Sequence, residues 1–207
     1  SALLFLCSFL SAQGPGWRID PYDDRDFVEN IGQFAPKNGQ NVLAAVDNKG
    51  TEIFYSPTGF TYQYRKPVEV PSYLVQKDSE EEPDNEKEDL TKILYDTLQI
   101  SAEWLGASAA AILLDSLQTP LFHYAAEGGQ IVGARSYSAL KYSDLYAGID
   151  LEYTFHASQG IKYSLTVKPG ANAADIALKF EGMENIFLDS EGNLHATLGD
   201  AALIDHA

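Results

Sequence analysis

The sequence predicts an all-β domain of packed antiparallel sheets, similar to a β-sandwich and with little helix. Apolar and polar residues alternate in many short stretches, of which Phe60–Arg65 is an example, and this period of two is typical of a half-buried strand. Turn sequences rich in glycine, proline or asparagine separate these stretches. We therefore expect meanders and hairpins built from about ten to thirteen short strands.

Composition is compatible with one large domain and excludes some partners. The chain has 207 residues, 45% of them hydrophobic, which is enough to build a core. Acidic residues outnumber basic ones by 30 to 14, which gives a net charge of -16. A surface with this negative charge repels phosphate backbones and anionic lipid. Neither nucleic acid nor a membrane is therefore an expected partner of the mature domain.

Residues 1–13 are predicted to be the remnant of a secretory signal peptide. Ala2–Leu10 is an apolar run too short to span a bilayer, and the small residues Ser11 and Ala12 follow it. We therefore expect Sec-dependent export to the cell surface or the extracellular space, with cleavage near Ala12 or Gln13. The alternative for the same apolar run is a buried N-terminal strand.

The only cysteine, Cys7, lies inside this apolar run. After cleavage the chain would therefore have no disulfide, no thiol nucleophile and no cysteine-based zinc site. At the other end, apolar–polar alternation continues into "AALIDHA", and we expect the natural polypeptide to continue past the β-domain.

Residues 14–26 are expected to be a leader into a single β-domain spanning 27–207. "FVENIGQF" at Phe27–Phe34 is expected to place an Asn-x-Gly turn between two aromatic anchors. Three strands are then expected in Asn41–Arg65, in "NVLAAVD", "TEIFYS" and "FTYQYR".

The segment 66–92 is expected to be an acidic surface loop that interrupts the domain. Prolines oppose regular structure there, and Asp78–Asp89 contains eight carboxylates. Calcium binding is a lesser alternative, because Asp84, Glu86 and Glu88 alternate but lack the EF-hand spacing. The prediction is a solvated insertion, and no cofactor is expected.

Strands are expected again from Ile93 to Trp104 and on both sides of the Gly128-Gly129 turn. The segment between them, Leu105–Gln118, is ambiguous. Its alanines favour a helix, whereas its length and the apolar "AILL" also fit a short buried strand. Later, "IALKFEG" and "NIFLDSEGNLHATLG" are expected to complete the meander, with "SEGN" as a hairpin loop.

The most regular predicted element is a hairpin within Leu145–Gly170. Its apolar face is expected to pair Leu151 with Leu165, Tyr153 with Tyr163, and Phe155 with Ile161. A slip of one residue would expose this whole face to water, so the register is expected to be firm.

The polar face of this hairpin carries two carboxylates, Asp150 and Glu152, about 7 Å apart by strand geometry. Paired carboxylates can perform acid–base chemistry on sugars. Their place on a solvated face beside Lys162 favours a structural role instead.

No other pattern defines a site. The histidines His123, His156, His195 and His206 show no metal-binding spacing, and nucleophile-elbow, P-loop and dinucleotide motifs are absent from the sequence. We therefore predict no catalytic, cofactor-binding or metal-binding residue, and a non-enzymatic domain is favoured over an enzyme. Aromatic strand residues such as Tyr62 and Tyr64 can form a platform for sugar rings, although packing on a second sheet is the favoured role.

Several stretches together resemble a known family: "FVENIGQF", "IFYSPTGFTYQY", "YAGIDLEY", "IKYSL", "VKPGA" and "KFEG". They are similar to a DUF7948-like N-terminal domain of unknown function in large secreted Bacteroidota proteins. The resemblance runs from about Phe27 to the end, although the family often has a basic residue where Ile31 stands and Trp where Phe34 stands. The family has no established catalytic residues, so none is carried over.

In those proteins the domain often precedes SBBP-type, β-propeller-like repeats, Ig-like domains and a gliding-motility-associated or sorting C-terminal domain. The resemblance therefore implies a structural or adhesive N-terminal module of a secreted or cell-surface protein. Its partners would be other domains of the same polypeptide, together with cell-surface glycans or proteins. The alternative is a carbohydrate-binding or glycan-active β-sandwich domain.

Overall fold

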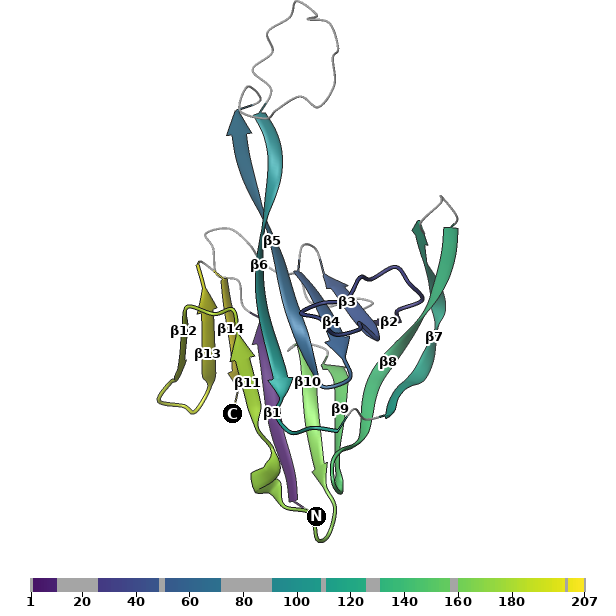
Figure 1. Ribbon diagram of the computed structural model, residues 1–207, viewed down its shortest axis with the longest axis vertical. Helices are drawn as coiled ribbons and strands as arrows, with labels where there is room; N and C mark the ends of the chain where they lie inside the picture. Colours follow the sequence, from purple (N-terminus) through teal and green to yellow (C-terminus); the bar gives the residue numbers. More distant parts are fainter. Residues whose placement is uncertain are drawn as a thin grey trace, which may run out of the picture.

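A computed structural model of the chain confirms the all-β prediction. It describes residues 2–10, 26–48, 51–71, 91–108, 111–125, 131–156, 160–199 and 201–206. Within these ranges, fourteen strands pair in an antiparallel manner in one sheet (Figure 1), and the helical content described is one 3-10 turn, η2, at Ala173–Asp175.

The first seven strands in chain order are β1 (Ala2–Leu10), β2 (Phe27–Glu29), β3 (Ala44–Asn48), β4 (Thr51–Ser56), β5 (Gly59–Pro71), β6 (Thr91–Trp104) and β7 (Ala111–Ala125). The others are β8 (Ile131–Tyr146), β9 (Ile149–His156), β10 (Gly160–Val167), β11 (Leu178–Glu181), β12 (Asn185–Leu188), β13 (Leu194–Leu198) and β14 (Ala201–His206). Hydrogen bonds link them in the order β11-β6-β5-β4-β3-β2-β8-β9-β10-β1-β14-β13-β12, and β7 pairs with β8 outside this path.

The sheet curls so that its two halves face each other and enclose the core. Trp104 of β6 contacts Tyr163 of β10 with ring centroids 5.7 Å apart, although six strands lie between β6 and β10 in the order of the sheet. Tyr55 of β4 meets Tyr153 of β9 at 4.9 Å in the same way. This packing of face on face is the sandwich-like arrangement that the alternating sequence predicted.

The polar atoms of the buried aromatic residues also form hydrogen bonds. Trp104 Nε1 donates a hydrogen bond to the Tyr153 hydroxyl at 3.2 Å, and the Tyr163 hydroxyl donates to Asp205 Oδ2 at 2.7 Å. Among the described side chains, every buried nitrogen and oxygen has a hydrogen-bond partner. The core therefore buries polar groups without the penalty of leaving them unpaired.

The predicted hairpin has the predicted register. Leu151 lies opposite Leu165, Tyr153 opposite Tyr163 and Phe155 opposite Ile161 in the β9–β10 ladder. The first two pairs are buried in the core, as the apolar face requires. Register was predictable here because both strands alternate without interruption.

"FVENIGQF" also forms the expected turn. The Asn30 Oδ1 atom accepts hydrogen bonds from the backbone N–H of Gly32 and Phe34, and Asn30 Nδ2 donates to the carbonyls of Phe34 and Val42 at 2.8–2.9 Å. Phe27 is buried in the main core, whereas Phe34 packs in a smaller cluster around Phe54. One asparagine thus fixes a loop between two separate aromatic anchors.

The predicted bounds of the acidic loop, 66–92, are wrong at both ends. β5 continues to Pro71 and β6 begins at Thr91, so the ladder runs on from Lys66–Asp96 to Pro71–Thr91 and forms a long two-stranded arm (Figure 1). Pro67 and Pro71 lie in the part of β5 whose described pairing is with β6 alone, and such an edge position tolerates the missing N–H. The calcium candidates Asp84, Glu86 and Glu88 lie outside the described residues.

The ambiguous stretch Leu105–Gln118 is resolved as a strand. From Ala111 onwards it belongs to β7, which pairs with β8 over its length except for a register shift between Leu117 and Leu121. The local preference of alanine for helix is weak, and the ladder with β8 outweighs it.

Ala2–Leu10 forms strand β1, which lies between β10 and β14 and is antiparallel to both. This is the arrangement that the sequence left open as the alternative to a signal-peptide remnant. The predicted leader lies outside the described residues, except for Asp26.

Candidate functional site

The carboxylates of Asp150 and Glu152 are held by two different lysines. Lys168 Nζ lies 2.9 Å from Asp150 Oδ1, and Lys141 Nζ lies 3.3 Å from Glu152 Oε1. The sequence predicted Lys162 of β10 as the neighbour of Glu152, whereas Lys141 lies directly opposite it on β8. The two carboxylates therefore belong to two separate ion-pair groups on the wet face of the sheet.

Electrostatics keep these groups charged. Partial burial opposes ionisation of Asp150, but hydrogen bonds from the Asp144 backbone N–H and from Lys168 hold the pKa of Asp150 below its ordinary value. Hydrogen bonds to Asp115 and to Glu152 raise the pKa of Lys141. A general acid near neutral pH needs a carboxyl pKa that is raised, so Asp150 is suited to an ion pair and not to proton donation.

The four histidines lie on four different strands. His123 is in β7 and His195 in β13, while His156 and His206 end β9 and β14. In the ranges that the structure describes, no three His, Cys, Asp or Glu side chains are arranged to hold a metal ion.

Asp189, which the sequence did not single out, closes the β12–β13 hairpin. Its Oδ1 accepts from the backbone N–H of Glu191 and Asn193, and its Oδ2 accepts from Asn193 Nδ2 and lies 2.9 Å from His195 Nε2. His195 and then Asn193 hold the pKa of Asp189 far below its usual range. The signal was present in "DSEGN", because aspartate before a glycine-containing turn commonly binds the turn's own N–H groups. The carboxylate is engaged within the hairpin, so it supports the loop.

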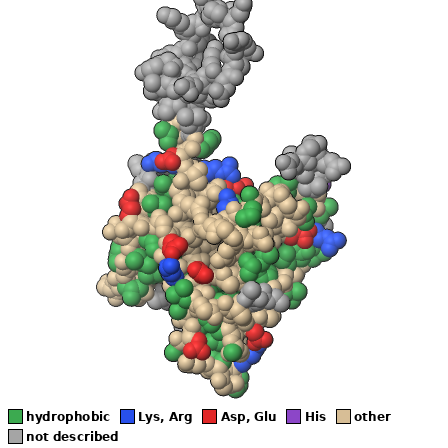
Figure 2. Space-filling model, in the orientation of Figure 1, with side chains coloured by type: hydrophobic (Ala, Val, Ile, Leu, Met, Phe, Trp, Pro, Cys, Tyr) green, Lys and Arg blue, Asp and Glu red, His purple; other side chains and the backbone are tan. Residues whose placement is uncertain are grey.

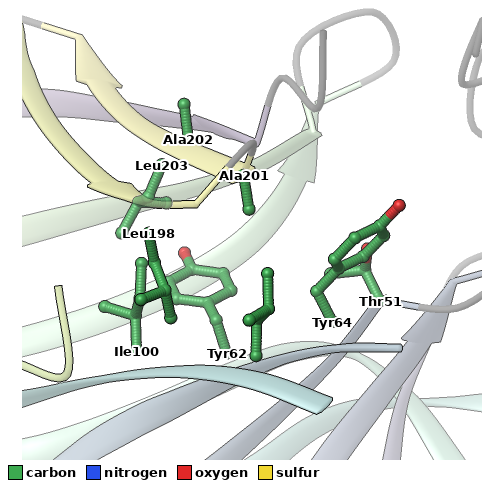
Figure 3. Close-up of a pocket in the computed structure, with 9 residues that line it drawn as sticks. Thr51, Tyr62, Tyr64, Ile100, Leu198, Ala201, Ala202 and Leu203 are labelled. Carbon is green, nitrogen blue, oxygen red and sulfur yellow. The ribbon is translucent and has the colours of Figure 1, made fainter. Parts of the chain in front are cut away.

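An apolar cavity of ≈ 30 Å³ lies between the facing halves of the sheet (Figure 3). Leu198, Ala201 and Leu203 approach it from β13 and β14 and face Tyr62 and Ile100 across it. This volume holds about two water molecules and is too small for a sugar ring. Tyr62 is only 9% exposed and serves the core, which is the role that the sequence favoured over a sugar platform.

A polar cleft of ≈ 90 Å³ lies on the outer face of the sheet, beneath the loop that contains Lys37 and Asn38. Lys37 Nζ donates to Gln63 Oε1 at 2.8 Å and sits 4.3 Å from the centroid of the Phe54 ring. Gln99 Nε2 donates to Asn38 Oδ1 at 2.7 Å. Glu103, Lys179 and Glu181 also line the cleft. The cleft combines amide, ammonium and carboxylate groups, which is the chemistry that recognises hydroxyl-rich ligands.

Two edge strands expose apolar side chains. In β12, Ile186, Phe187 and Leu188 are 48%, 51% and 67% exposed. In β7, the exposed leucines are Leu113, Leu117 and Leu121. Each strand has one hydrogen-bonded neighbour among the described strands, and the two lie on opposite sides of the molecule (Figure 1). Figure 2 shows hydrophobic side chains on both of these sides.

The apolar edge of β12 was not predicted, although the sequence contains a signal for it. Ile186, Phe187 and Leu188 are three consecutive apolar residues, whereas a strand with one wet face alternates. A strand that is apolar on both faces is normally covered on both. Here it ends the described sheet, and its three apolar side chains are exposed.

Fold and surface together define an all-β domain whose prominent polar clusters are ion pairs and loop-closing hydrogen bonds. Among its described residues, six of the ten exposed large apolar side chains lie on the edge strands β7 and β12. No helix in the described residues is long and apolar enough to cross a membrane.

A family model described as "Domain of unknown function (DUF7948)" matches residues 27–207, and the chain therefore belongs to this family. No curated protein and no solved structure matches the chain.

Proposed function

We propose that this domain is a non-enzymatic structural or adhesive module at the N-terminal end of a larger secreted or cell-surface bacterial polypeptide. A Sec signal peptide in residues 1–13 would direct its export, as the resemblance to Bacteroidota proteins suggests. Its direct partners are neighbouring domains of the same polypeptide, which it contacts through the edges of its sheet.

The observation that carries this proposal is the pair of exposed apolar edge strands, β12 and β7, on opposite sides of the molecule. Soluble proteins normally protect sheet edges with charge, proline or short strands, because a free apolar edge promotes association. A module with two such edges can contact one neighbour on each side. Fully burying one Leu or Phe side chain contributes about 1.5–3 kcal/mol, and a half-exposed one contributes a fraction of that.

A non-enzymatic role is supported by the state of the polar groups. Asp150 and Glu152, which the sequence offered as a carboxylate pair, each form an ion pair with a lysine. Burial raises the pKa values of the core tyrosines Tyr142 and Tyr153, so these hydroxyls stay protonated and do not act as bases.

Photo-crosslinking in the full-length polypeptide tests the docking proposal. A photoreactive phenylalanine analogue at position 188 of β12 or 117 of β7 is expected to crosslink to other domains of the same polypeptide. The same analogue at position 97, exposed on β6, is the control. In parallel, Leu188→Lys should change the stability of the domain by no more than about 0.5 kcal/mol, because the side chain is already exposed.

Crosslinks that appear equally at position 97, or that are missing at positions 188 and 117, would refute docking through the edges. Mass spectrometry of the digested polypeptide identifies the crosslinked peptides directly.

A second candidate is a carbohydrate-binding domain, and the polar cleft beneath Lys37 and Asn38 is the observation that favours it. Its volume of ≈ 90 Å³ accepts part of one sugar unit rather than an oligosaccharide, and the aromatic residues that line it, Phe54 and Phe60, are buried. Sugar sites commonly present an open aromatic ring, so we rank this candidate second.

A glycan array separates the two candidates. For the docking module, we expect no binding that depends on Glu103, which lines the cleft. A glycan whose affinity falls at least about tenfold in Glu103→Ala, but not in Asp96→Ala, would establish the second candidate. Asp96 is a matched control because it is an exposed carboxylate on the same strand, β6.

A further inference from the structure

We propose that the space occupied by β1, between β10 and β14, is a strand-acceptor slot in the exported protein. After removal of residues 1–13, the slot would receive an extended apolar strand that follows this domain in the same polypeptide. This inference rests on the export part of the proposed function, because the slot opens only when Ala2–Leu10 is removed.

The backbone register defines the slot. β10 pairs with the first part of β1, from Ala2–Val167 to Cys7–Lys162, and β14 pairs with the second part, from Cys7–His206 to Leu10–Leu203. β10 and β14 are not paired with each other, and their other neighbours are β9 and β13. Without β1, each of them would therefore have one open edge, and both edges would face the same gap.

The same strands carry part of the core. Tyr163 and Leu165 of β10 and Leu203 of β14 are 3%, 1% and 3% exposed. If the slot were open, water would reach the edges of β10 and β14. The backbone N–H and C=O groups on these edges would also lack ladder partners, which folded proteins avoid. The mature domain consequently needs a replacement strand at this position.

The register also specifies the replacement. It has to be extended over about nine residues, the length of β1, and antiparallel to both neighbours. Residues directly opposite each other in a ladder share a face, so the positions opposite Tyr163 and Leu165 have to be apolar. Addition of such a strand to an open sheet edge is an established mode of peptide recognition.

Topology indicates the source of this strand. β12, β13 and β14 form a meander in which each strand pairs with the next one in sequence. A strand joined to β14 by a hairpin would run antiparallel to it on its remaining edge, and this is the position and direction of β1. A later segment of the same polypeptide can therefore fill the slot, after a connection that extends past the end of β14 to the level of Val167, where β1 begins.

The first experiment determines the N-terminus of the protein secreted by its own host. Mass spectrometry should show a mature chain that begins near Gly14. A secreted chain that retains Ala2–Leu10 would overturn both the signal-peptide proposal and the slot. The crosslinking test of the β12 and β7 edges does not depend on this outcome, so docking can succeed or fail separately.

The second experiment uses the chain beginning at Gly14 and a synthetic peptide with the β1 sequence, carrying Cys7→Ser and terminal lysines for solubility. Hydrogen exchange followed by mass spectrometry should show that the peptide protects the amides of β10 and β14. A peptide with N-methyl groups on alternate amides is the control, because it keeps the side chains but cannot complete a ladder. The β4–β5 ladder is the internal reference and should be unchanged.

Every outcome of the second experiment decides the question. If the shortened chain folds only with the unmethylated peptide, the slot is supported; if it folds with neither peptide, the slot is overturned. A folded chain whose β10 and β14 amides are protected without peptide has closed its own gap, and this also overturns the proposal. Light scattering that shows a dimer held by the same amides would replace the proposed strand with a second copy of the chain.

In the full-length polypeptide without residues 1–13, the amides of β10 and β14 should be protected and the peptide should not bind. Peptide binding to this longer protein with the same affinity as to the shortened chain would exclude a donor from within the polypeptide.

Discussion

Replacement of Tyr153 by alanine is expected to lower the free energy of unfolding by about 3–5 kcal/mol. Tyr153 is 3% exposed and its ring contacts those of Tyr55, Phe60, Tyr142 and Tyr163, with centroids 4.9–6.1 Å apart. These rings come from strands in both halves of the curled sheet, so the cavity would lie where the halves meet. Urea denaturation followed by tryptophan fluorescence measures the loss.

Tyr153→Phe is the matched control, because it keeps the ring and removes only the hydroxyl. That hydroxyl accepts from Trp104 Nε1 in the buried core, so its removal leaves an unpaired donor and should cost about 1–3 kcal/mol. A phenylalanine variant as unstable as the alanine variant would show that the hydrogen bond, and not ring packing, joins the two halves.

Gly59→Ala is expected to destabilise the domain by about 3 kcal/mol, at the upper end of the usual overpacking range. A Cβ atom at Gly59 would lie 2.1 Å from the carbonyl oxygen of Ala102 in β6, which is far inside van der Waals contact. Ala102 is buried and its strand is paired on both sides, by β5 and β11, so the backbone cannot move away without breaking a ladder. Thermal unfolding by circular dichroism reports the change.

Gly133→Ala provides the comparison within the same sheet. A Cβ atom at Gly133 would meet its nearest neighbours, in His123 and Leu121, at 3.8 Å, which is ordinary contact. We expect a change of no more than about 0.5 kcal/mol. Equal losses in the two variants would mean that glycine is needed in these strands for a reason other than the approach of β6 to Gly59.

Local alternation made part of this fold predictable. In β9 and β10, hydrophobic side chains recur at every second residue, so only one register buries Leu151, Tyr153, Tyr163 and Leu165 together. The Asn-x-Gly turn after Phe27 was predictable for a similar reason, since its hydrogen bonds lie within a few residues of Asn30.

Features that depend on distant pairing were not predictable from the sequence. The extension of the β5–β6 arm through Pro67 and Pro71 depends on partners about 20 to 30 residues later, which local proline rules do not include. The order of the sheet depends on contacts such as Trp104–Tyr163. Alternation states that a strand has an apolar face, but it does not state which other strand covers that face.

Contacts on the surface were also hard to predict where they depend on which strands are neighbours. Asp150 and Glu152 were correctly placed on one polar face, but local alternation did not indicate the ion pair of Glu152 with Lys141, which lies on β8 on the other side of β9 from β10. The apolar edge of β12 became visible as a surface only when its place at the end of the strand order was known.

The position of β2 between β3 and β8 has a consequence for how the chain reaches this structure. Asp26, the residue before β2, accepts a hydrogen bond from Ser136 of β8 at 2.8 Å, and 110 residues separate the two. The β3–β4–β5 meander can form as soon as it emerges during synthesis or export, but β2 closes the sheet only after β8 has followed. All-β topologies with such distant pairing fold in about milliseconds to seconds, and open edges stay accessible during that time. Because β8 is synthesised long after β2, the pairing of β2 with β8 is a late step of folding. Until that step, the early meander has to be shielded from other chains if the domain is to fold without aggregating.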